Sequence, residues 1–140
     1  MFKTPEFYYD EEQYFVGFSF SVIINKEPWY SLKFLLSLMN SKLGEIWFER
    51  YGKKRWVWVD IGVWVFREFP IPAVSESQQK PIIDLVDQML LAQKRFREAE
   101  FEDDKRIIEK QIEIIDGKID EIVFDLYGLS EEERKVVLDR

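Results

Sequence analysis

The chain is organised around residues 34–72, which read FLLSLMNSKLGEIWFERYGKKRWVWVDIGVWVFREFPIP. An apolar helix pattern leads into a basic, aromatic turn at residues 50–58, and a β-rich run then ends on Phe69-Pro70-Ile71-Pro72. No other part of the sequence combines positive charge, tryptophan and chain-stiffening proline in this way. This segment is therefore the first candidate for a binding surface.

This segment predicts one helix and one strand. Ser31 has the side chain of an N-cap, and apolar residues recur at three- and four-residue steps from Leu32 to Trp47. Gly52 is a natural stop, so we expect a helix over residues 31–52. Residues 56–66 are rich in tryptophan and valine and alternate in parity, which predicts a strand with a bend or bulge at Gly62.

The preceding sequence predicts a second strand. Apolar side chains occupy the even positions from Tyr14 to Ile24, while Gly17, Ser19 and Ser21 lie between them. A period of two over this length is typical of a long strand with one buried face. We expect this strand to support the central segment.

The sequence from Glu76 onward predicts helices. Pro81 suits the first turn of one helix, and residues 108–126 of a second helix place isoleucine and leucine in a heptad seam. Gly117 lies within that seam, where glycine costs about 1 kcal/mol relative to alanine unless it admits another helix. A capping box at the pair Ser130 and Glu133 predicts a short terminal helix.

Together these elements predict an α+β fold. We expect a small, mostly antiparallel sheet with a packed helix, followed by a long helical hairpin and a short C-terminal helix. The 140 residues correspond to one unit of ordinary domain size. We expect residues 1–75 to form the α/β part and residues 76–140 the hairpin and terminal helix, packed as one compact unit.

Composition excludes several classes of chemistry. The chain has no cysteine and no histidine, so disulfides, thiolate or imidazole metal sites, cysteine nucleophiles and histidine bases are excluded. The longest uncharged run, residues 14–25, is too short and too polar to span a bilayer. The acidic N-terminal residues lack the basic and apolar regions of a signal peptide. We expect a cytoplasmic protein that does not bind membranes.

Charge is segregated along the chain. Residues 42–68 contain six basic and four acidic residues, a balance of +2 in a chain whose net charge is -7. Cations interleaved with aromatic residues can meet phosphates while planar groups stack on bases. The plain alternative is a solvated turn. The candidate DNA-binding residues are Lys42, Arg50, Tyr51, Lys53, Lys54, Arg55, Trp56 and Trp58.

Two other functions are compatible with the same sequence. The heptad seam of residues 108–126 could be plain core, or it could form a homodimer or dock a protein partner without any nucleic acid. Asp84 with the Asp103-Asp104-Lys105 run loosely resembles the acids of metal-dependent nucleases. These acids fall in a helix and in a helix connection rather than on adjoining strand ends, so we expect no metal site and no catalysis.

Four segments resemble a known family when they are taken in order. They are LLSLMNSKL, FREFPIP, SESQQKPIIDLVDQML and IDEIVFDLYGLSEEERKVV. From about Phe18 to the C-terminus the chain resembles the TaqI-like C-terminal specificity domain of type II DNA methyltransferases and fused restriction-modification enzymes. Target-recognition domains of type I specificity subunits share the layout of Pro-x-Pro, glutamine and long helix.

The resemblance implies a function. Such a domain reads a short DNA sequence and presents the target adenine to a separate catalytic domain. Residues 1–75 would then be the target-recognition part, with residues 50–58 facing double-stranded DNA and residues 82–126 supporting them. The sequence contains no Asn-Pro-Pro-Tyr/Phe motif and no cofactor-binding glycine loop. We therefore expect a non-catalytic chain without a cofactor, whose partners are DNA and a methyltransferase catalytic domain or subunit.

Overall fold

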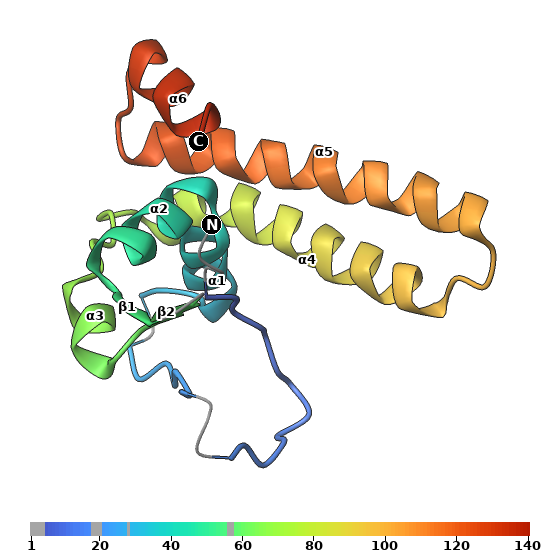
Figure 1. Ribbon diagram of the computed structural model, residues 1–140, viewed down its shortest axis with the longest axis horizontal. Helices are drawn as coiled ribbons and strands as arrows, with labels where there is room; N and C mark the ends of the chain where they lie inside the picture. Colours follow the sequence, from blue (N-terminus) through green and yellow to red (C-terminus); the bar gives the residue numbers. More distant parts are fainter. Residues whose placement is uncertain (1–4, 18–20, 28, 56–57) are drawn as a thin grey trace.

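Two long antiparallel helices dominate the structure (Figure 1). The computed structural model describes residues 5–17, 21–27, 29–55 and 58–140. Within those ranges the regular elements are α1 (Leu32–Asn40), α2 (Lys42–Tyr51), β1 (Lys53–Arg55), β2 (Trp58–Asp60), α3 (Val63–Glu68), α4 (Glu76–Glu98), α5 (Glu102–Leu126) and α6 (Glu131–Leu138). The predicted α+β class is confirmed, with a mostly helical balance.

The helical hairpin of α4 and α5 is confirmed. Residues 99–101 connect the two helices. Most of the charge-dense stretch at residues 98–105, whose composition suggests a connection, is therefore helical. Helix α4 also begins earlier than predicted: Ser75 and Gln78 form a capping box, and Pro81 lies inside the helix rather than in its first turn. The seam is covered within the chain, since Ile108 and Ile119 are buried.

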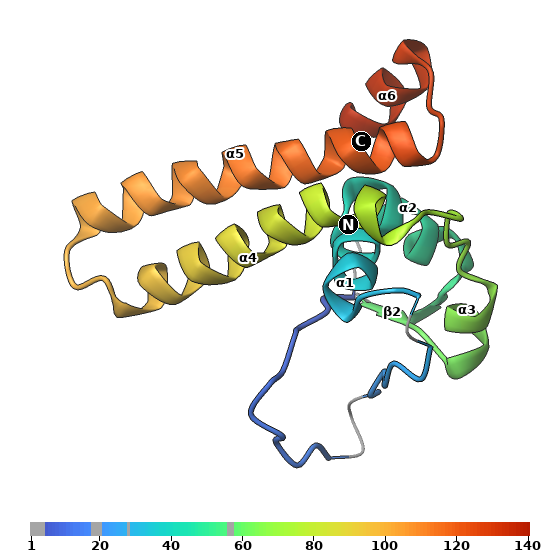
Figure 2. The ribbon, with the colours of Figure 1, turned by 180° about the vertical axis from the view of Figure 1, so that it is seen from behind.

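Helix α1 packs across the base of this hairpin and forms the main core with it. Tyr30 stacks on Phe34 at the start of α1, with a ring-centroid distance of 6.1 Å. The fully or almost fully buried residues of this core are Phe34, Leu38, Ile82, Val86, Ile119 and Val123. Helices α1 and α2 are thereby held at one end of the hairpin, whose other end extends away from them (Figure 2).

The helix predicted over residues 31–52 is broken into α1 and α2. Ser31 caps α1 and Gly52 ends α2, as predicted. Between the helices, Ser41 adopts an extended conformation, and its hydroxyl donates to the Leu38 carbonyl at 2.7 Å and accepts the Gly44 N–H at 3.0 Å. A Cβ at Gly44 would collide with the Leu38 carbonyl. The serine and the glycine therefore allow a tight corner that the apolar periodicity alone conceals.

The strand predicted over residues 14–24 is wrong. Residues 14–17 and 21–24 form no strand, and the apolar side chains among them are exposed, including Tyr14 at 69% and Ile24 at 74%. Residues 18–20 lie outside the described ranges. A strand needs a partner that takes its backbone hydrogen bonds and covers its apolar face. Among the described residues, the three-residue strands β1 and β2 pair only with each other.

The strand predicted over residues 56–66 is correct for Trp58–Asp60 and wrong from Val63 onward, while residues 56 and 57 lie outside the described ranges. After Gly62 the chain forms helix α3, in which Val65 is fully buried. The ring of Phe66 lies 5.8 Å from those of Phe7 and Phe48. A helix places Val65 and Phe66 on one side of the chain, whereas a strand would turn them to opposite faces. The full burial of Val65 and the ring contacts of Phe66 on the same body therefore favour the helix.

Candidate nucleic-acid interface

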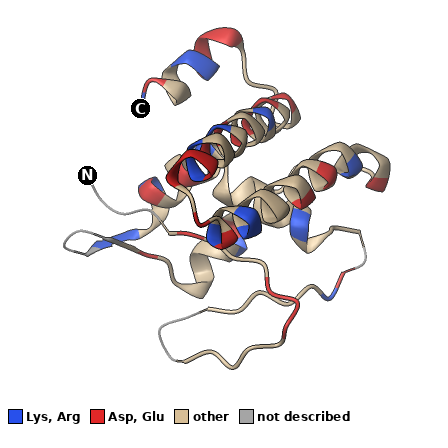
Figure 3. Ribbon diagram, turned by 90° about the vertical axis from the view of Figure 1, so that its right-hand side faces the viewer, with Lys and Arg blue, Asp and Glu red and all other residues tan. Residues whose placement is uncertain are grey.

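The basic turn of the sequence is a β-hairpin that projects from the end of α2. Its antiparallel register places Lys53 opposite Asp60 and Lys54 opposite Val59. Both lysine side chains are exposed. Figure 3 shows the basic stretch of β1 at the edge of the molecule. The hairpin thus presents two adjacent lysines on a two-stranded ribbon, a shape that fits a DNA groove.

Gly52 and Val59 anchor the hairpin to α2. Val59 is only 7% exposed, and a Cβ at Gly52 would collide with the Val59 side chain. The same Cβ would lie 3.3 Å from Ile61 Cγ2. Because Gly52 has no side chain, Val59 and Ile61 can close over the end of the helix. The two lysines are therefore held by a packed base.

Arg50 and Tyr51 lie on the last turn of α2, next to this base. The Arg50 guanidinium is 5.9 Å from the centre of the Tyr51 ring, within the range of a cation–π contact. The Tyr51 ring lies 4.8 Å from that of Trp47, and about half of Tyr51 is exposed. Together they present one cation and one supported aromatic ring to solvent. Both groups can bind a phosphate–base unit of a nucleic acid.

The other predicted site residues are placed less fully. Lys42 lies at the opposite end of α2, roughly 13 Å along the helix from Tyr51. Its ammonium is 3.5 Å from Glu45. Trp56 lies outside the described residues, and for Arg55 and Trp58 the backbone pairing in the hairpin is described. The structure therefore brings Arg50, Tyr51, Lys53 and Lys54 together and leaves Lys42 apart.

Helix α3 adds two side chains that the sequence reasoning missed. Trp64 and Arg67 are both exposed and, being three residues apart on a helix, lie on the same side. Read as a strand, the segment separates them onto opposite faces. The sequence signal that could have indicated a shared face is the three-residue spacing of the tryptophan and the arginine, followed by the apolar Phe69.

An apolar cavity of about 380 Å³ opens beside Arg50 and Tyr51. Trp47, Phe69 and Tyr127 form much of its wall. The Tyr127 hydroxyl donates a hydrogen bond to the Pro70 carbonyl, and burial raises the pKa of Tyr127 to about 12. This tyrosine therefore stays neutral at physiological pH. The cavity gives the candidate interface an apolar border without adding charge.

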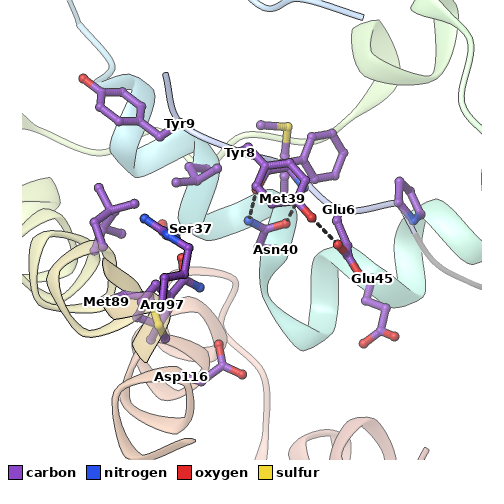
Figure 4. A pocket seen from close by; sticks show the side chains of 17 residues that line it. Glu6, Tyr8, Tyr9, Ser37, Met39, Asn40, Glu45, Met89, Arg97 and Asp116 are labelled. Carbon is purple, nitrogen blue, oxygen red and sulfur yellow. Dashed lines mark hydrogen bonds between the residues drawn. The ribbon is translucent and has the colours of Figure 1, made fainter. Parts of the chain in front are cut away.

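A larger cavity, of about 490 Å³, lies under the N-terminal segment (Figure 4). Residues 5–9 cross α1 there. Two hydrogen bonds between the Asn40 side-chain amide and the backbone of Phe7 hold the segment in place. The Phe7 N–H donates to Asn40 Oδ1 at 3.0 Å, and Asn40 Nδ2 donates to the Phe7 carbonyl at 2.8 Å. The ring of Phe7 then reaches Phe48 at 5.1 Å. The cavity is the space left between this crossing segment and the helical hairpin.

The charges around that cavity do not suit a phosphate. Glu6, Glu45 and Asp116 contribute carboxylates to its wall, and Arg97 contributes a guanidinium. Burial, with the charge of Glu45 second, raises the pKa of Asp116. A nucleic-acid backbone would meet like charge here, so the hairpin and α2 remain the candidate interface.

The acids considered for a metal site are dispersed. The Lys80 ammonium lies 3.2 Å from Asp84, and Lys105 lies 3.3 Å from Glu102. Asp103 forms an ion pair with Arg106. Across the described ranges, no three metal-ligating side chains gather in one place. Nothing in the arrangement of these acids supports a nuclease centre.

Comparison with known proteins identifies the family. The family model for the TaqI-like C-terminal specificity domain matches residues 2–71, which is half of the chain. The chain belongs to the family of TaqI-like C-terminal specificity domains. No curated protein and no solved structure matches it.

The matched residues contain α1, α2, the β1–β2 hairpin and α3, and they end just before α4. All the clustered candidate residues, Arg50, Tyr51, Lys53 and Lys54, therefore lie within the family's own part of the chain. Among the helices built from described residues, none has the length and apolar character needed to cross a membrane.

Proposed function

We propose that the chain is a target-recognition unit of an adenine-type DNA methyltransferase or of a fused restriction-modification enzyme. It binds double-stranded DNA through the β1–β2 hairpin and the end of α2, and it carries out no catalysis alone. Residues 1–75 form the recognition part, and residues 76–140 form its helical support. The methyltransferase catalytic domain or subunit is the protein partner.

One observation carries this proposal. In a chain of net charge -7, two consecutive lysines are exposed on a projecting ribbon, one toward each of its faces, and the buried Val59 anchors the base of this ribbon. The ribbon lies in the part that matches a specificity-domain family. An acidic chain gains little from non-specific attraction to DNA, so contact must come from a local basic surface. The hairpin with Arg50 supplies such a surface.

The test is a salt titration of DNA binding. The full chain and the double variant Lys53→Gln, Lys54→Gln are titrated against a fluorescent duplex at several salt concentrations. Glutamine is preferred to glutamate because a glutamate at position 53 would face Asp60 across the hairpin. We expect weaker binding by the variant. Its slope of log K against log salt should be shallower by about 0.9 for each lost phosphate contact.

The matched control is Lys110→Gln, Lys118→Gln on α5, which removes the same charge from exposed positions. This control should retain wild-type affinity and slope. If both double variants bind alike, the hairpin is not the contact surface. If the wild-type chain binds no duplex even with its methyltransferase partner present, the proposed function itself is wrong.

Methyl transfer gives a second readout. We expect no methylation of DNA by the chain with a methyl donor alone, and sequence-dependent methylation when the catalytic partner is added. Methylation by the isolated chain would contradict a purely recognition role.

A further inference from the structure

Helix α3 has two sharply different faces. Its inner face is fixed by Val65, which is fully buried, and by Phe66, which contacts Phe7 and Phe48. Just beyond the helix, Phe69 stacks on Phe48 with a centroid distance of 5.2 Å and an interplanar angle of 11°. The helix is therefore held firmly on the aromatic cluster. Its outer face cannot turn inward without breaking these contacts.

The outer face carries Val63, Trp64 and Arg67, all exposed. Half of the Trp64 surface is open to solvent, beside the exposed Val63, so the indole is available to a partner. Its indole lies back over Gly62: a Cβ at that position would be 3.1 Å from both Trp64 Cδ1 and Nε1. The absence of a side chain at Gly62 therefore leaves the space that the Trp64 indole occupies.

Helix α3 lies close to the hairpin of the proposed DNA surface. Strand β2 ends at Asp60 and α3 begins at Val63, so at most about 11 Å of chain separates them. Figures 1 and 2 both show α3 next to the hairpin, at the end of the molecule opposite the tip of α4 and α5. Residues 53–68 contain four basic and two acidic residues, so the local charge complements DNA.

An arginine and a tryptophan on one side of a helix can make contacts with DNA that lysines cannot make. An arginine forms two parallel hydrogen bonds with guanine O6 and N7, and an aromatic face packs on sugars or base-step edges. Lysines on the hairpin are point charges that suit phosphates. Helix α3 has six residues, about 9 Å of length, and the major groove is about 12 Å wide.

We propose that α3 is the base-reading element of this domain, with Arg67 pairing to a guanine edge and Trp64 packing beside it. The hairpin lysines hold the phosphate backbone. This inference rests on the proposed DNA-binding function and goes beyond it, because it assigns sequence reading to two residues outside the basic turn.

The test separates contacts that recognise the base sequence from contacts that bind the phosphate backbone. Duplexes with a randomised segment are selected for binding to the full chain, and the enriched sequences are compared among variants. The variants are Arg67→Gln, Trp64→Leu, Gly62→Ala, Lys53→Gln with Lys54→Gln, and the control Arg95→Gln. Arg95 is an exposed arginine near the far end of α4. Circular dichroism establishes that each variant is folded.

We expect Arg67→Gln to lose at least about tenfold in its preference for guanine at one position while keeping the rest of the motif. Trp64→Leu should relax the neighbouring position, and Gly62→Ala should relax it partly by displacing the indole without removing it. The lysine variant should bind all sequences more weakly with an unchanged motif. Arg95→Gln should behave as wild type.

Three outcomes would overturn the inference. The first is a motif that Arg67→Gln and Trp64→Leu leave unchanged. The second is DNA binding by the wild-type chain that enriches no motif. The third is loss of methyltransferase association in these variants with normal DNA selection, which would make the α3 face a protein contact. If the wild-type chain bound no DNA at all, the result would instead contradict the proposed DNA-binding function.

Discussion

Asp120 is a partly buried carboxylate on α5 that caps the start of α2. The Lys42 N–H donates to its Oδ1 at 2.8 Å. Burial raises the pKa of Asp120 to about 6, although that hydrogen bond opposes the shift. The carboxylate is therefore protonated more readily in the folded chain than in the unfolded one. Its ionisation lowers the stability of the fold.

The sign of the pH dependence follows directly. Between pH 4 and 6 the folded chain holds a proton at Asp120 that the unfolded chain has released, so stability falls as pH rises through this window. Asp120→Asn keeps an oxygen acceptor for Lys42 but cannot ionise. We expect it to flatten this fall and to raise the unfolding free energy at pH 7 by on the order of 1 kcal/mol.

Urea unfolding at several pH values measures the effect, with the exposed Glu113→Gln on the same helix as the control. Parallel pH curves for wild type and Asp120→Asn would contradict the assignment.

Substitution by alanine should have opposite effects on stability at two glycines. A Cβ at Gly117 of α5 meets nothing within 4 Å among the described residues, so no helix approaches it. Gly117→Ala should therefore stabilise the chain by about 1 kcal/mol through helix propensity. Gly44→Ala should destabilise it by about 1–3 kcal/mol, because its Cβ meets the backbone of α1. Thermal unfolding of the two variants checks both, and a shift of the same sign would refute the packing at the corner.

At the level of elements, one glutamine joins α4 to α1. Gln79 is only 2% exposed. It accepts the Ser31 N–H at 3.0 Å and donates to the Trp29 carbonyl at 2.6 Å. It therefore satisfies two backbone groups of the segment that precedes α1. This role gives a physical reason for the glutamine that follows the Pro-x-Pro segment in the resemblance.

Gln79→Leu should destabilise the fold strongly. The substitution keeps the volume but leaves two backbone groups without partners, each costing about 1–3 kcal/mol. We expect a loss of about 2–4 kcal/mol in the unfolding free energy. Gln88→Leu, an exposed glutamine on the same helix, should change it by less than about 0.5 kcal/mol. Equal losses in chemical denaturation would show that the buried bonds do not hold the two helices together.

The sequence predicted the elements that end on caps and carry long amphipathic patterns. The hairpin of α4 and α5, the cap at Ser31 and the capping box at Ser130 are confirmed, because local side chains or many turns of periodicity define them. The strand at residues 14–24 failed because alternation cannot show whether a partner strand exists. The strand predicted over residues 56–66 failed from Val63 onward, because VWVFRE has apolar residues at both the strand and the helix period, and the packing of Val65 and Phe66 selects the helix.

The candidate site was predictable in part for the same reason. The cluster of Arg50, Tyr51, Lys53 and Lys54 follows from sequence proximity around a turn. Lys42 is near them in the sequence but lies at the other end of a helix. Trp64 and Arg67 could be placed on one surface only once the helical state of α3 was known.

At the level of the whole molecule, the N-terminal segment differs from the helical body. Residues 10–17 and 21–27 are exposed throughout, whereas residues 30–48 are mostly buried or half-buried. Chymotrypsin should therefore cut first near Tyr14 and Phe15, and it should leave a resistant body that begins close to α1. Mass spectrometry of a brief digest identifies the sites. An early cut within α1 or α4 would mean that the helical body is less stable than its packing implies.

The α4–α5 hairpin has a mechanical consequence, because α1 and α2 hold it at only one end. Its 23-residue first helix is roughly 35 Å long. A tilt of about 10° at the core would carry the loop at residues 99–101 through roughly 6 Å. The arm thus amplifies small rearrangements near α1, and a partner bound at its tip would change the angle at which the basic ribbon approaches DNA in the proposed complex.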